Sequence, residues 1–101
     1  MREKLEKIIE AYKELETKLG DPAVLADQHE YNKLAKSFSD QGPLVAKARE
    51  YIQCLDDLAE AKEMLDAGGL EKDFREMVEQ ELNDSRKQLE VIADELKILL
   101  L

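Results

Sequence analysis

The sequence Ala67-Gly68-Gly69-Leu70 separates two long stretches of helical pattern. Apolar side chains recur at steps of three and four across residues 44–65, and again across residues 70–99. This spacing places each set on one face of a helix. A connection as short as Gly68-Gly69 forces two long helices to fold back on each other. The sequence therefore predicts helices over 43–67 and 70–100 that form an antiparallel hairpin.

A third helix is predicted at the N-terminus, over residues 2–19. Its apolar stripe consists of Leu5, Ile8, Ile9, Tyr12, Leu15 and Leu19. Gly20 is a helix stop. Asp21 then caps a short turn that begins at Pro22, because proline needs no N–H partner at a first helical position.

A fourth helix is predicted over residues 28–41. Asp27, followed three residues later by Glu30, resembles a capping box. The run Ser39-Asp40-Gln41-Gly42-Pro43 predicts the end of this helix. Pro43 then opens the next helix. The predicted last helix is longer than its predicted hairpin partner by about seven residues, which corresponds to roughly 10 Å.

The composition agrees with this pattern and excludes other folds. A chain of 101 residues has room for one domain. Two prolines and four glycines are too few for the turns of an all-β sandwich. We therefore expect one all-α domain over 1–101, an elongated helical bundle of about four helices with a long antiparallel hairpin.

The net charge of the chain limits the kinds of molecule that it can bind. The net charge is −9, with 24 acidic against 15 basic residues, which argues against direct binding to nucleic acid. The excess lies on the predicted hairpin, where residues 43–67 hold six acidic and three basic groups and residues 70–101 hold nine and five. Such a surface suits a basic protein. No apolar run has membrane-spanning length, and a lone cysteine is typical of a cytoplasmic protein.

The residues that could carry chemistry do not form a pattern. His29 is the only histidine and lies at a predicted helix start, where a surface or capping role is typical. Cys54 lies close to Asp56 and Asp57, whose negative charge raises a thiol pKa and suppresses reactivity. Gly68-Gly69 lacks the spacing and the lysine of a phosphate-binding loop. We predict no catalytic, cofactor or metal site.

The hairpin end is the candidate contact surface. Apolar and acidic side chains alternate around the turn, and the candidate partner contacts are Met64, Asp66, Leu70, Asp73 and Phe74. A small apolar anchor inside an acidic rim would complement a basic protein. The alternative is that the apolar groups only close the end of the core.

The order and spacing of several short motifs resemble the N-terminal helical domain of bacterial class I peptide chain release factors. The matching residues are Asp21-Pro22, Val24, Asp27, Tyr31, Leu34-Ala35-Lys36, Pro43-Leu44-Val45, Tyr51, Leu58-Ala59-Glu60-Ala61-Lys62, Phe74-Arg75-Glu76-Met77 and Glu81-Leu82. The similarity covers essentially the whole chain. It implies translation termination, in which the full factor recognises UAA and UAG and promotes peptidyl-tRNA hydrolysis on the ribosome.

The resemblance also implies what this chain lacks and what it contacts. The family's Gly-Gly-Gln loop and codon-recognition motif belong to later domains; here Leu70 follows Gly68-Gly69, so this chain is interpreted as a non-enzymatic fragment. The implied partners are the protein at the base of the large-subunit stalk and the recycling GTPase release factor. Two alternatives stay open. One is a free-standing helical adaptor, and the other is a small enzyme that uses His29 or the carboxylates.

Overall fold

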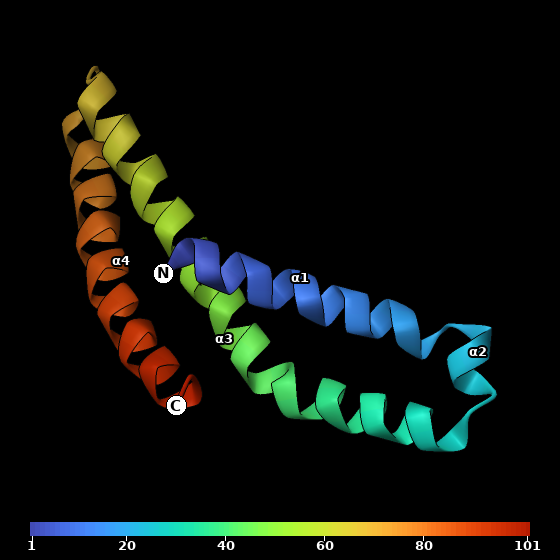
Figure 1. Ribbon diagram of the computed structural model, residues 1–101. Coiled ribbons are helices and arrows are strands. Elements are labelled where there is room, and N and C mark those ends of the chain that lie inside the picture. Colours follow the sequence, from blue (N-terminus) through green and yellow to red (C-terminus); the bar gives the residue numbers. More distant parts are fainter. The chain divides into compact units, whose positions relative to one another are not determined.

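The chain forms helices and no strands, as predicted. The computed structural model describes residues 1–101, and its helices are α1 (Arg2–Leu19), α2 (Pro22–Leu25), α3 (Gln28–Ala67) and α4 (Lys72–Leu99) (Figure 1). The chain divides into two compact units, unit 1 over Met1–Arg49 and unit 2 over Glu50–Leu101, and α3 contributes to both. None of the helices combines the length and the apolar character needed to cross a membrane.

The first helix has the predicted bounds. Its stripe is buried most completely at Leu5 and Leu15, which are 0% and 9% exposed. At the C-terminal end, the Gly20 N–H donates to the Thr17 carbonyl at 3.1 Å. Gly20 has a φ of −95°, so it ends the helix without entering the left-handed region.

Two aspartates set the start of the next helices. A side-chain oxygen of Asp21 accepts a hydrogen bond from the Ala23 N–H at 2.9 Å, and Pro22 occupies the first helical position of α2. Asp27 likewise accepts from the Glu30 N–H at 3.1 Å, directly before α3. Both bonds satisfy N–H groups that a helix start leaves without partners. The predicted caps are confirmed.

The predicted break between residues 41 and 43 is wrong, because α3 runs without interruption for 40 residues with Pro43 inside it. An interior proline removes the hydrogen bond to the carbonyl of Ser39 and crowds the preceding residue. Gly42 has no Cβ to clash with the proline ring. Beyond the proline, Val45 and Ala48 are 1% and 0% exposed. The burial of these side chains offsets the proline and keeps the helix continuous.

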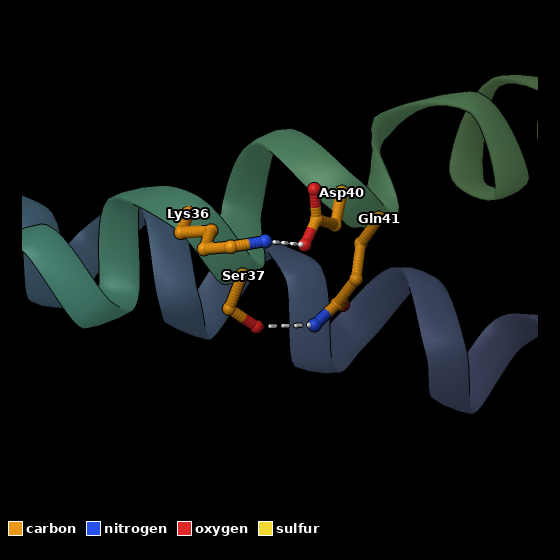
Figure 2. A network of polar contacts seen from close by, with 4 residues as sticks. All are labelled: Lys36, Ser37, Asp40 and Gln41. Carbon is orange, nitrogen blue, oxygen red and sulfur yellow. Dashed lines mark hydrogen bonds and ion pairs between the residues drawn. The ribbon is translucent and has the colours of Figure 1, made fainter.

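Local hydrogen bonds also support the turn that precedes Pro43. Lys36 Nζ donates to Asp40 Oδ2 at 3.0 Å, and Gln41 Nε2 donates to Ser37 Oγ at 2.9 Å (Figure 2). Both pairs are four residues apart, so each spans one turn of α3. Asp40 and Gln41, which belong to the run predicted to end a helix, therefore stabilise a helix that continues.

Unit 1 is an antiparallel pair formed by α1 and the first part of α3, with α2 at the reversal (Figure 1). The rings of Tyr12 and Phe38 stack between them, with centroids 4.3 Å apart and planes 11° apart. Stacking of this kind adds about 0.5–1.5 kcal/mol to the effect of burial.

Unit 2 is the predicted hairpin of α3 and α4 (Figure 1). Gly68 and Gly69 have φ values of 71° and 76°, which only glycine adopts without strain. The Cys54 Sγ donates to the Ser85 carbonyl at 3.2 Å and so joins the two arms. The predicted antiparallel hairpin and its turning point are both confirmed.

The last helix is shorter than predicted. It begins at Lys72 because Glu71 is extended, with φ −64° and ψ 152°, and it ends at Leu99. Within unit 2 the α3 arm runs over 50–67, so α4, with 28 residues, is the longer arm of the hairpin. The predicted excess of about seven residues was counted from Pro43 and stays a prediction.

The apolar stripe of α4 is buried only in part. Val78, Ile92 and Leu96 are buried, whereas Phe74 and Leu99 are each 41% exposed. Spacing alone placed all five on one face, but a helix in a two-helix hairpin has too little partner surface to cover the whole stripe. Phe74 is therefore a surface residue at the hairpin end.

Candidate functional site

The two residues with catalytic potential belong to different units. His29 is exposed in the first turn of α3. Cys54 is buried in unit 2, where burial raises the pKa of its thiol and the nearby Asp57 carboxylate raises that pKa further. The predicted direction of this shift is confirmed, with burial as the larger cause. No group of three His, Cys, Asp or Glu side chains is placed to hold a metal ion.

Charge separates the two units sharply. Unit 1 holds nine acidic and nine basic residues, whereas unit 2 holds 15 acidic and six basic residues. The whole net charge of −9 is therefore carried by unit 2. A single-sign field of this kind attracts basic partners and repels nucleic acid.

The five candidate contact residues all lie within two helical turns of Gly68-Gly69. Met64 and Leu70 are half-buried, Asp66 and Asp73 are exposed, and Phe74 is 41% exposed. Neither Asp66 nor Asp73 takes part in any of the ion pairs of the chain. The hairpin end therefore has exposed carboxylates next to the apolar side chains of Met64, Leu70 and Phe74.

A hollow on the side of the hairpin was not predicted. It measures about 80 Å³ and is lined by Asp57, Glu60, Ala61, Met64 and Glu81. On α3 the lining residues recur at steps of three and four, which indicates a common face. Only the packing of α4 against α3 brings Glu81 to that face, so no local sequence signal could have identified the hollow.

The comparison with known protein families shows which family the chain belongs to. The PCRF domain family matches residues 8–101. The chain belongs to this family. The PCRF domain match covers all of α2, α3 and α4 and most of α1, so it extends over both units. It confirms the resemblance to release factors inferred from the short motifs.

Curated relatives are similar to this PCRF domain over its whole length. Peptide chain release factor 1 of Caldicellulosiruptor bescii is 46% identical, that of Caldicellulosiruptor saccharolyticus 45% and that of Symbiobacterium thermophilum 40%, each over 101 residues. The chain spans 28% of the length of each of these relatives. No solved structure matches the chain. These similarities do not favour the free-standing adaptor.

Proposed function

We propose that this PCRF domain is the N-terminal, ribosome-contacting domain of a peptide chain release factor that acts in translation termination in the cytoplasm. The observation that carries the proposal is the similarity of all 101 residues to release factor 1 proteins, of which they span 28%. In the full factor, other domains recognise UAA and UAG and promote hydrolysis of peptidyl-tRNA. We expect residues 1–101 to act as the single N-terminal helical domain of that factor.

The domain itself contributes no chemistry. Its one thiol is buried and donates to the Ser85 carbonyl, with its pKa raised, so it is a poor nucleophile at neutral pH. We expect the 101-residue chain to release no labelled peptide from ribosomes halted at a stop codon. Stop-codon-dependent release by the chain alone would contradict this assignment.

The partner of the hairpin end is the basic protein at the base of the large-subunit stalk, with the recycling GTPase release factor as a second partner. Met64, Leu70 and Phe74 form the apolar part of the contact, and Asp66 and Asp73 form its charged rim. The exposure of Phe74 and the unpaired carboxylates support this placement.

The test is binding to the purified stalk-base protein. Asp66→Lys with Asp73→Lys should weaken association and reduce its salt dependence, because the charged rim is inverted. The matched control is Asp84→Lys with Glu90→Lys, which changes the net charge equally on exposed positions away from the turn. Equal weakening by both pairs would mean that only total charge matters, and no weakening by either would place the contact elsewhere.

A further inference from the structure

The side of the hairpin combines a hollow with exposed apolar side chains. Ala61, 4% exposed, and the half-buried Met64 are the apolar part of the hollow described above. On α4, Met77 precedes the lining residue Glu81 by one turn, and Phe74 precedes Met77 by one more turn, so all three lie on the same side of the helix. Met77 is 59% exposed. We name this surface, formed by the hollow together with Phe74 and Met77, the hairpin groove.

The carboxylates of the hairpin groove have no cationic partner within the chain. Glu60 and Glu81 take part in none of the ion pairs of the chain. Asp57 accepts a hydrogen bond from the neutral Gln53 amide at 2.9 Å. By contrast, Arg75 and Lys97 lie within 4 Å of Glu79 and Asp94 elsewhere on α4. The groove therefore has negative charge on both arms beside an apolar floor.

The apolar floor and the carboxylates of the hairpin groove indicate which kind of side chain it binds. A lysine or arginine side chain has an apolar stem that can lie on Ala61 and Met64 and a cationic head that can reach the carboxylates. A second copy of this chain is disfavoured, because unit 2 carries the full net charge of −9 and two such surfaces repel each other. A nucleic acid backbone is repelled for the same reason.

We propose that the hairpin groove binds a basic segment of a protein, with one lysine or arginine side chain in the hollow and an apolar side chain on Met77 and Phe74. The assignment rests on the proposed function, because a domain that contacts the ribosome meets basic proteins there. It adds a lateral binding surface that extends from the hairpin end along one side of α3 and α4.

The experiment measures binding of the 101-residue chain, labelled at its N-terminus, to purified bacterial ribosomes. Glu60→Gln with Glu81→Gln should weaken binding about tenfold, which corresponds to about 1.4 kcal/mol. The matched control is Glu63→Gln with Glu90→Gln, which removes two exposed carboxylates outside the hollow and changes the charge equally. The control should bind within about twofold of the unaltered chain. Circular dichroism verifies that each variant is folded.

A second measurement identifies the occupant. A photoreactive phenylalanine analogue at Met77 should crosslink to a ribosomal protein at a peptide that contains lysine or arginine. Crosslinks to ribosomal RNA would overturn the proposal. So would equal affinities of the groove and control variants while the unaltered chain binds, and in that case the proposed function would stand. If the unaltered chain did not bind ribosomes, both the groove proposal and the proposed function would be contradicted.

Discussion

The two units are built from similar lengths of chain, 49 and 52 residues, but they differ in charge and in how the chain reverses. Unit 1 holds nine acidic and nine basic residues, whereas unit 2 holds 15 acidic and six basic residues. The chain of unit 1 reverses through the capped helix α2, and that of unit 2 reverses at two glycines with a left-handed backbone conformation. Both are antiparallel helix pairs. Helix pairing therefore does not require the acidity of unit 2, which leaves that charge available for a partner.

The largest expected effect tests whether the cores are alike despite the charge difference. Leu5 in unit 1 and Leu96 in unit 2 are both 0% exposed. Leu5→Ala and Leu96→Ala should each lower the free energy of unfolding by about 2–5 kcal/mol, because each leaves a cavity. Urea unfolding followed by circular dichroism measures the change.

The control for these two substitutions is Ile98→Ala, at a side chain that is 70% exposed. It should change the free energy of unfolding by less than about 0.5 kcal/mol. A loss at Leu96 no larger than that at Ile98 would show that the core of unit 2 is not closed there.

The next largest effect concerns Pro43, which lies inside α3 in the part that belongs to unit 1. Pro43→Ala should stabilise the chain by about 1–3 kcal/mol, because alanine restores an N–H for the Ser39 carbonyl and has a higher helix propensity. Part of the gain is offset by the greater freedom of the unfolded chain. Pro22→Ala, at the first position of α2, should have little effect. A loss of stability at residue 43 would mean that the proline ring itself makes essential contacts.

A smaller effect distinguishes the two reversals. Gly69→Ala should cost about 1–2 kcal/mol, because its φ of 76° is strained for alanine. Beyond the adjacent residues of the chain, no atom lies within 4 Å of the added Cβ, so the cost comes from the local backbone conformation and not from a contact with another part of the fold. Gly20→Ala in unit 1 should cost less, because Gly20 has a φ of −95°. Thermal unfolding of both variants makes the comparison, and equal costs would contradict the assigned turn geometry.

The smallest effect is the pH dependence from Cys54 in unit 2. Burial and Asp57 raise its pKa above the ordinary value of 9.0. Stability from this group is fully present below pH 9.0 and is lost as the pH rises from that value through the raised pKa, because the unfolded chain then loses its proton first. Alkylation by iodoacetamide at pH 8 should therefore be slower in the folded chain than in urea. Asp57→Asn should accelerate it slightly, and identical folded and unfolded rates would show that the thiol is exposed.

Local chemistry explains why much of the fold could be predicted. The stripe of α1, the caps at Asp21 and Asp27 and the turn at Gly68-Gly69 depend on residues only a few positions apart in sequence. The short motifs that indicated a release factor are also local, and the PCRF domain match confirms them. The acidic neighbours of Cys54 predicted the direction of its pKa shift but not burial, which is the larger cause.

Tertiary structure decided the features that join distant residues. The helix α3 passes through Pro43 because Val45 and Ala48 are buried beyond it and Phe38 stacks on Tyr12 before it. The sequence shows the cost of that proline but not the burial that offsets it. The hollow is a second example, since Glu81 meets Glu60 and Met64 only through the register of α4 against α3. The sequence by itself determined the bounds of α1, the two aspartate caps and the turn at Gly68-Gly69, because those depend on residues close together in the chain. The tertiary structure determined which apolar residues stay exposed and where the hairpin groove lies, because both depend on how much surface of a partner helix each helix contacts.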